Sequence, residues 1–157
     1  MKKISIAELF YDTGELSVVT KMASGFKHTW IVEKDSDSLQ TIKTNFPNEL
    51  KINEDVTKFS QNSNLRKIKK LKGSFEGLVF GFPCNDFSIV GKKRGFKGKF
   101  GGLYIYACKV LKFFKPKFFL AENVSNIATS NKKSLIYKNF QKILHDFKKL
   151  GYEIKMK

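Results

Sequence analysis

The sequence predicts an α/β protein in which a parallel sheet carries helices on both faces. Short apolar segments of high β propensity alternate with segments of helical spacing roughly six times along the chain. Polar or reactive side chains directly follow several of the apolar segments. Ligands bind at this carboxyl edge of parallel sheets, so we expect the functional residues there. The length of 157 residues suits one domain with a substantial core.

The first part of the chain contains three expected strands and two expected helices. In order, these segments are strand 3–10, helix 16–23, strand 29–32, helix 37–46 and a short strand around Ile52. The helix 37–46 follows from the spacing of Leu39, Ile42 and Phe46, and it stops at Pro47.

The second part of the chain repeats the alternation. Its expected segments are strand 78–82, helix 102–114, strand 118–121, helix 134–150 and a last strand over 152–156. The helix 134–150 is the most clearly amphipathic, with apolar side chains along one side: Leu135, Phe140, Ile143, Leu144 and Phe147. Gly151 is its expected C-cap.

The charge balance favours a polyanionic partner. There are 30 Lys and Arg residues against 14 Asp and Glu, a net charge of +16, which indicates nucleic acid above all. All but two of these cations, Arg66 and Arg94, are lysines, and heavy Lys usage also arises from an AT-rich coding sequence. The positive charge therefore reflects either contact with nucleic acid or the base composition of the coding sequence.

Composition also bounds the compartment and the cofactors. No stretch approaches the ~20 apolar residues of a membrane span, and the first residues lack a signal-peptide pattern, so we expect a cytoplasmic protein without membrane contact. Cys84, Cys108, His28 and His145 show no metal-binding spacing, so no metal is expected.

Three groups of residues at strand ends can carry chemistry. The turn Asp12-Thr13-Gly14, with Glu33 further along, can approach a nucleotide-like ligand and accept hydrogen bonds from ribose hydroxyls, but an ordinary turn would look the same. Cys84 follows Pro83 in a polar loop and is either a nucleophile or an inert thiol. Glu122 either binds a nitrogen base or is a solvated loop residue.

Several motifs resemble those of the DNA (cytosine-5)-methyltransferases. Gly81-Phe82-Pro83-Cys84 followed by Phe87-Ser88 resembles the family's catalytic motif, and Glu122-Asn123-Val124 resembles its E-N-V motif. Three further segments resemble the cofactor motifs: Ala7 to Phe10, Glu33 to Phe46, and Glu54 to Thr57. The five motifs occur in the family's order. The resemblance implies a Rossmann-like, mostly parallel sheet of the S-adenosylmethionine-dependent methyltransferase type.

The resemblance also implies a role for each matching residue. Cys84 would attack carbon 6 of a flipped cytosine in DNA, so that carbon 5 takes the methyl group of S-adenosylmethionine. Glu122 would hold the base and assist its protonation, and Asn123 would shape that pocket. The implied cofactor contacts are Phe10 at the adenine, Glu33 at the ribose, Asp55 at the adenine amine and Gly14 at the amino-acid end, with Asp12, Thr13, Lys34, Val56, Phe82 and Pro83 around them. The implied DNA contacts are Ser88, Lys92, Lys93 and Arg94.

The sequence also departs from the family pattern. Asp12 stands for a glycine of the cofactor turn and Glu15 for another residue that is usually glycine, while Asn85-Asp86 replaces Gln-Pro after the nucleophile. Only 33 residues follow Val124, and the arginine strand and the target-recognition domain of the family have no counterpart in them.

Residues 1–157 therefore resemble the cofactor and nucleophile part of the catalytic domain, as a fragment or a split-enzyme subunit that needs a second polypeptide. One alternative is an inactive remnant or a basic DNA-binding module on the same scaffold. Another is a nucleotide-binding α/β domain of different chemistry. The target sequence, and a role in restriction-modification or in regulation, stay open.

Overall fold

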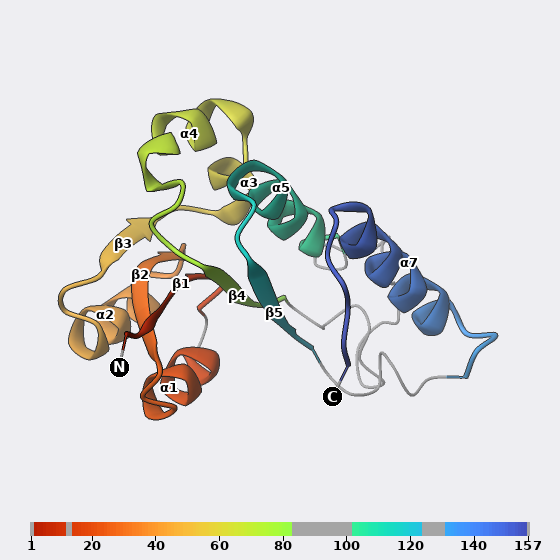
Figure 1. Cartoon of the computed structure of the whole chain (residues 1–157), viewed down its shortest axis with the longest axis horizontal. Helices are drawn as coiled ribbons and strands as arrows, with labels where there is room; N and C mark the ends of the chain where they lie inside the picture. The colour runs from red at the N-terminus through yellow and green to blue at the C-terminus, as the bar shows by residue number, and fades with distance from the viewer. Residues whose placement is uncertain (1, 12–13, 83–101, 124–130, 157) are drawn as a thin grey trace.

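Five parallel strands form one sheet in the computed structural model, which describes residues 2–11, 14–82, 102–123 and 131–156. Their order across the sheet is β3-β2-β1-β4-β5 (Figure 1). The strands are β1 (Ile4–Leu9), β2 (Phe26–Glu33), β3 (Leu50–Asn53), β4 (Gly77–Gly81) and β5 (Phe118–Glu122). The chain builds outward from β1 to β3 and then returns to place β4 on the other side of β1. In parallel sheets with such a reversal of strand order, ligands bind at the carboxyl edge beside the reversal.

Helices cover both faces of the sheet, as the sequence predicts. On one face lie α1 (Glu15–Met22) and α2 (Ser36–Asn45), and on the other lie α3 (Val56–Phe59), α5 (Tyr104–Phe114) and α7 (Leu135–Lys149) (Figure 1). The short helices α4 (Asn62–Lys67) and η1 (Lys69–Leu71) belong to the connection between β3 and β4. The described helices include none that is long and apolar enough to cross a bilayer.

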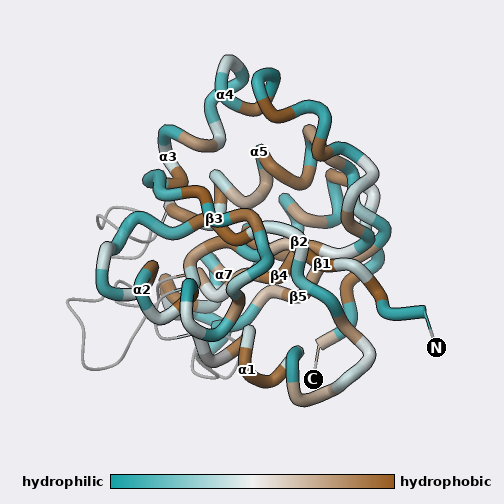
Figure 2. Tube along the Cα trace, turned by 90° about the vertical axis from the view of Figure 1, so that its left-hand side faces the viewer, coloured by the Kyte–Doolittle hydropathy of each residue, from teal (hydrophilic) through white to brown (hydrophobic). Residues whose placement is uncertain are grey.

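The main core lies between the sheet and the face of α3, α5 and α7. Trp30 of β2 is fully buried there and packs against Phe59, Phe75 and Phe114, with ring centroids 5.1 to 5.8 Å apart. A smaller cluster under α2 contains Tyr11, Ile31, Leu39, Ile42 and Phe46. The hydropathy colouring shows the apolar residues gathered between these layers (Figure 2). Each face of the sheet thus has its own apolar layer.

The boundaries of α7 confirm the helix that the amphipathic pattern predicts. The Ser134 side chain accepts a hydrogen bond from the Tyr137 backbone N–H at 3.1 Å and so caps the first turn. Gly151 follows the helix with φ 93°, a left-handed conformation that favours glycine. Of the predicted apolar side, Ile143 and Phe147 are buried, whereas Leu135 in the first turn is 54% exposed.

The prediction of a strand over 152–156 is wrong. This segment pairs with no described strand, although its first side chain contacts the edge strand β5. The Tyr152 ring packs edge-on against Phe119 at 5.1 Å, and its hydroxyl donates a hydrogen bond to the Pro116 carbonyl oxygen at 2.8 Å.

Candidate active site

The turn after β1 places two unusual backbone conformations at the carboxyl edge. Phe10 has φ 58° and Gly14 has φ 80°. A Cβ atom at Gly14 would overlap the ring of Tyr11, which packs directly against it. Glycine is therefore required at position 14 both for its dihedral angles and for its lack of a side chain. The same residue is the N-cap of α1, so the turn aims the start of α1 at the edge.

Glu33 lies at the carboxyl end of β2 and is held by the backbone that follows it. Its Oε1 atom accepts hydrogen bonds from the Lys34 and Asp35 backbone N–H groups, both at 2.8 Å. The side chain is buried, with 8% of the residue surface exposed. Two N–H donors on one oxygen fix the orientation of the carboxylate before any ligand binds.

Asp55 occupies the corresponding position after β3. Its Oδ1 atom accepts a hydrogen bond from the Thr57 backbone N–H at 2.8 Å and caps α3, and its Oδ2 atom lies 3.6 Å from Lys34 Nζ. The Thr57 hydrogen bond and the Lys34 charge hold the pKa of this carboxyl below its usual range. Asp55 is therefore ionised at neutral pH. The neighbouring residue Val56 is buried in the main core.

The ends of β4 and β5 are tied together beside the segment that leads to Cys84. Gly81 pairs in register with Glu122, and the Asn123 Nδ2 atom donates a hydrogen bond to the Phe82 carbonyl oxygen at 2.8 Å. A Cβ atom at Gly81 would approach Glu122 Oε2 to 3.2 Å, so the Glu122 carboxylate lies against the backbone of β4. The structure thus brings Glu122, Asn123 and Phe82 together.

Two buried groups near the turn were not predicted from the sequence. Tyr11 packs under Gly14 and against Phe46, with ring centroids 6.3 Å apart. Glu8 is almost fully buried, accepts a hydrogen bond from the Ser17 hydroxyl and lies 3.2 Å from His28 Nε2. The sequence offered one indication of the contact between Glu8 and Ser17: a glutamate lies within the apolar strand 3–10, and a serine lies within the helix that follows.

The remaining predicted site residues lie outside the described part of the chain. They are Asp12, Thr13, Pro83, Cys84, Ser88, Lys92, Lys93 and Arg94. Of the two cysteines, only Cys108 is described: it is half-buried on α5, and burial raises the pKa of its thiol to about 12. It therefore stays protonated at neutral pH and is a poor nucleophile.

Three described residues at the carboxyl edge carry chemical groups that can bind a nucleoside. Phe10, Glu33 and Asp55 stand at the ends of three adjacent parallel strands, β1, β2 and β3. Carboxylates accept hydrogen bonds from ribose hydroxyls and from an exocyclic amine, and an aromatic ring offers a stacking surface. Among the described residues, no three His, Cys, Asp or Glu side chains gather as metal ligands would.

Comparison with known proteins places the chain among the cytosine methylases. Residues 4–157 match the family model of the C-5 cytosine-specific DNA methylases. The Type II methyltransferase M.BbvI of Brevibacillus brevis is 31% identical over 97% of this chain, and the match covers 43% of that protein. M.PspPI of a Psychrobacter strain is 35% identical over 98% of this chain and 34% of its own length. The chain thus spans less than half of these relatives.

Solved structures give the same picture at the level of the fold. A protein described as a DNA modification methyltransferase encoded within an Escherichia coli prophage superimposes with a TM-score of 0.65 at 27% identity, over 91% of this chain and 38% of that one. A DNMT2 variant of Spodoptera frugiperda gives a TM-score of 0.61 at 20% identity, over 92% of this chain and 41% of that one.

Proposed function

Because the chain belongs to the C-5 cytosine-specific DNA methylase family, we propose that it supplies the cofactor pocket and the nucleophile for methylation of carbon 5 of cytosine in DNA. The observation that carries the proposal is the junction of β4 and β5. Asn123 donates to Phe82 O, and Glu122 pairs with Gly81. The base-binding carboxylate therefore stands beside the strand that reaches Cys84 three residues later.

The hydrogen-bond acceptors at the carboxyl edge fit S-adenosylmethionine. Glu33 is oriented by two backbone N–H groups, Asp55 is ionised, and Gly14 leaves the turn free of a side chain. We assign Glu33 to the ribose hydroxyls, Asp55 to the adenine amine and Phe10 to the adenine ring. Bound S-adenosylmethionine would supply an electrophilic methyl group, and these three residues would hold its nucleoside part.

The residues of the β4–β5 junction would act on the cytosine. The Cys84 thiolate adds to carbon 6 of a flipped base while Glu122 delivers a proton to the ring nitrogen. Carbon 5 would then bond to the methyl carbon as the bond between that carbon and the cofactor's sulfur breaks. Loss of the carbon 5 proton to water, return of the ring-nitrogen proton to Glu122 and release of the Cys84 thiolate would restore the double bond between carbons 5 and 6. Asn123, through its hydrogen bond to Phe82 O, acts as a positioning residue for the segment that carries Cys84.

In this proposal, sequence outside these 157 residues completes the enzyme. The chain spans 43% of M.BbvI and 34% of M.PspPI. The remaining length of those relatives is the expected source of target recognition and of further base-binding groups. Charge-assisted hydrogen bonds to the flipped base are worth about 1.5–3 kcal/mol each, so their absence would slow the reaction severely. We therefore expect the isolated chain to bind cofactor and DNA but to transfer methyl groups poorly.

A methyl-transfer assay tests the proposal. The chain is incubated with labelled S-adenosylmethionine and cytosine-containing DNA, alone and together with the polypeptide encoded by the adjacent reading frame. We expect transfer only in the complete mixture. Cys84→Ser should abolish it, and Cys108→Ser should leave it intact, since the Cys108 thiol stays protonated. Transfer that survives Cys84→Ser would refute the assignment of the nucleophile.

The second candidate function is a catalytically inactive DNA-binding module on the same scaffold. The substitutions in the motifs favour it: Asp12 and Glu15 add carboxylates to the cofactor turn, and Asn85-Asp86 replaces the usual pair after Cys84. This candidate predicts DNA binding without any heat-stabilising effect of S-adenosylmethionine. A thermal shift series with the cofactor and with a nucleotide of unrelated chemistry separates the two functions.

A further inference from the structure

The connection between β3 and β4 carries a dense group of cations outside the candidate active site. From Val56 to Phe75 the sequence contains no Asp or Glu. The same stretch contains six Lys and Arg residues, and all six are exposed: Lys58, Arg66, Lys67, Lys69, Lys70 and Lys72. We call these six side chains the basic cluster. None of them belongs to the site residues predicted from the sequence.

The local structure turns the basic cluster outward. Leu65, Ile68 and Leu71 recur every third residue along α4 and η1, and they pack within or against the main core. The cations occupy the positions between them. The Asn64 side-chain amide donates a hydrogen bond to the Lys58 carbonyl oxygen at 2.9 Å, which ties α4 to α3. The cationic surface is thus held in place before any partner arrives.

Folding alone does not account for the basic cluster. Like charges three or four residues apart on helical turns repel each other, and Arg66 has Lys69 and Lys70 at these spacings. Within the described part of the chain, no ion pair involves a cation of the cluster, whereas Lys117 and Lys142 each pair with a carboxylate. The cluster therefore gathers repelling charges that no carboxylate of the described residues neutralises.

The arginines distinguish a binding surface from a bias of composition. An AT-rich coding sequence raises the Lys content but not the Arg content. The chain has two arginines, and both lie in runs of cations: Arg66 in the run 66–72 and Arg94 in the run 92–94. A guanidinium group suits phosphate oxygens because two of its N–H groups can donate to them at once. The run 66–72 therefore has the composition of a phosphate-binding surface.

Duplex DNA is the polyanion that fits the basic cluster best. A basic segment that binds membranes also inserts apolar side chains, but those of this segment pack against the core. Gln61, Asn62 and Ser63 are exposed beside the cations, and their amide and hydroxyl groups can donate to phosphate oxygens as well. The chain belongs to a family of DNA methylases, so DNA is also the polyanion that it is expected to meet.

We propose that the basic cluster is a second, sequence-independent binding site for the phosphate backbone of duplex DNA, separate from the proposed contacts at 88–94. Helix α4 projects at one side of the molecule, away from the ends of β4 and β5 (Figure 1 and Figure 2). The cluster therefore holds DNA at a distance from the target cytosine and keeps the protein on the polymer without reading bases. The choice of DNA as the polyanion rests on the proposed function.

Two variants of equal net charge test the second site. The cluster variant combines Arg66→Gln, Lys67→Gln, Lys69→Gln and Lys70→Gln. The control variant replaces by Gln four exposed lysines that are dispersed over β2, α2 and α7: Lys27, Lys43, Lys148 and Lys149. Thermal unfolding checks that both variants fold. Binding of the whole chain to a duplex is measured by fluorescence anisotropy over a range of salt concentrations.

We expect the slope of log K against log salt to become shallower by about 3 to 4 in the cluster variant, because about 0.9 is lost with each phosphate contact. The control variant should keep a slope close to that of wild type. Equal slopes for the two variants would overturn the proposal, because the charge would then act without a defined contact.

Lysine acetylation locates the contact independently of affinity. Bound duplex should protect Lys67, Lys69 and Lys70 from acetylation and leave Lys148 and Lys149 reactive, as read by mass spectrometry. Absence of this protection would overturn the proposal. Phosphatidylserine vesicles and polyglutamate probe the other classes of partner, and tighter binding of either one through the cluster would overturn the choice of DNA.

Methyl transfer is measured with the same variants in the mixtures of the assay described above. Protection and a changed slope without any transfer would refute the proposed function and leave the second site in place. Transfer by the wild type, together with equal slopes for the two variants, would refute the second site alone.

Discussion

Glu33 and Asp55 lie at adjacent strand ends, but the backbone holds them differently. Glu33 is buried and receives two N–H groups on one oxygen, whereas Asp55 is half-exposed and receives one N–H group with Lys34 nearby. Preorganised carboxylates contribute more to binding than mobile ones, because no ordering is needed when the ligand arrives. Glu33 is therefore the residue on which cofactor affinity should depend most.

Glu33→Gln should weaken S-adenosylmethionine binding by about 10- to 100-fold, because a hydrogen bond to a charged acceptor is worth about 1.5–3 kcal/mol. Isothermal titration with the cofactor measures the change. Asp37→Asn, an exposed carboxylate in the first turn of α2, serves as the control and should bind normally. Equal affinities for wild type and Glu33→Gln would remove Glu33 from the cofactor site.

The buried contact between Ser17 and Glu8 should matter for stability. Ser17→Ala would leave the Glu8 carboxylate, which is 1% exposed, without one of its donors. Stranding a buried polar group costs about 1–3 kcal/mol. Urea unfolding should show that loss with an unchanged m-value, while Ser63→Ala, on the exposed side of α4, should unfold like wild type. A Ser17→Ala variant as stable as wild type would contradict this account.

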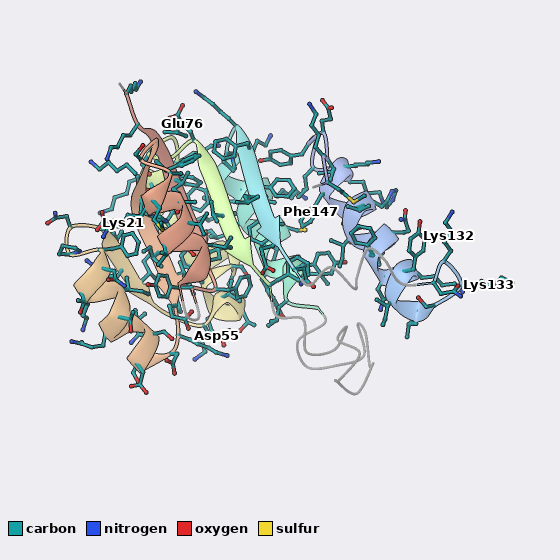
Figure 3. The ribbon with its side chains drawn as sticks, turned by 90° about the horizontal axis from the view of Figure 1, so that it is seen from below. Lys21, Asp55, Glu76, Lys132, Lys133 and Phe147 are labelled. Carbon is teal, nitrogen blue, oxygen red and sulfur yellow. The ribbon has the colours of Figure 1, made fainter. Side chains whose placement is uncertain are left out.

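At the scale of elements, one carboxylate joins three strands at the amino edge of the sheet. Glu76 precedes β4, accepts hydrogen bonds from the Ser5 backbone N–H at 3.3 Å and from Lys117 Nζ at 2.8 Å, and so links the starts of β1 and β5. Figure 3 shows Glu76 and Asp55 at opposite ends of the sheet. The link is therefore structural and remote from the candidate active site.

Glu76 should give the stability a pH dependence. The Lys117 hydrogen bond, together with the Ser5 N–H, lowers the pKa of Glu76 in the folded chain. A carboxyl with a lowered folded pKa stabilises the protein above its unfolded pKa, and this contribution fades as pH falls toward the folded pKa. The gap in unfolding midpoint between wild type and Glu76→Gln should therefore be present near pH ~7 and shrink toward pH ~3. A gap that is constant across this range would contradict the prediction.

Sequence patterns located the strands and the long helices, and the failures have physical causes. The spacing of apolar residues in β1, β2 and α7 reflects the side chains that face the core. The sequence therefore predicts these elements. The helices α3 and α4 are four and six residues long, too short to show a helical period, and only the cap residue Asp55 marks the start of α3. The segment 152–156 has strand propensity, but in the structure it is held by side-chain contacts of Tyr152 with Phe119 and Pro116 and joins no described strand through its backbone.

The residues of the candidate site could be predicted only where a polar side chain directly follows a predicted strand or a turn requires glycine. Glu33, Asp55 and Glu122 were recognisable because each follows an apolar strand, and Gly14 because a turn needs it. The hydrogen bond from Asn123 to Phe82 O joins two residues that are distant in the sequence. The packing of Tyr11 under Gly14 depends on the backbone dihedral angles of the turn. No local pattern encodes such contacts. The first contact follows from the pairing of β4 with β5, and the second from the dihedral angles of the turn.

At the scale of the whole molecule, the acidic residues are unevenly distributed along the chain, so one stretch is strongly positive. Between Gly77 and Ala121 there are nine Lys or Arg residues and a single acidic residue, Asp86. This stretch contains Cys84 and the residues proposed to contact DNA. A polyanion should therefore be attracted to the part of the chain that carries the nucleophile, with little dependence on its base sequence.

DNA binding by the isolated chain should accordingly weaken steeply with salt, with a slope of log K against log salt of about −0.9 for each phosphate neutralised. The triple variant Lys92→Gln, Lys93→Gln, Arg94→Gln should make this slope shallower by about 3, because three phosphate contacts are lost. The matched control neutralises Lys2, Lys3 and Lys27, which lie at the amino ends of β1 and β2, away from the candidate site. Fluorescence anisotropy with two duplexes of unrelated sequence measures both slopes.

Equal slopes for the two triple variants would contradict the prediction, because the positive charge would then act only as a diffuse field. A preference for one duplex would show that this chain recognises base sequence by itself.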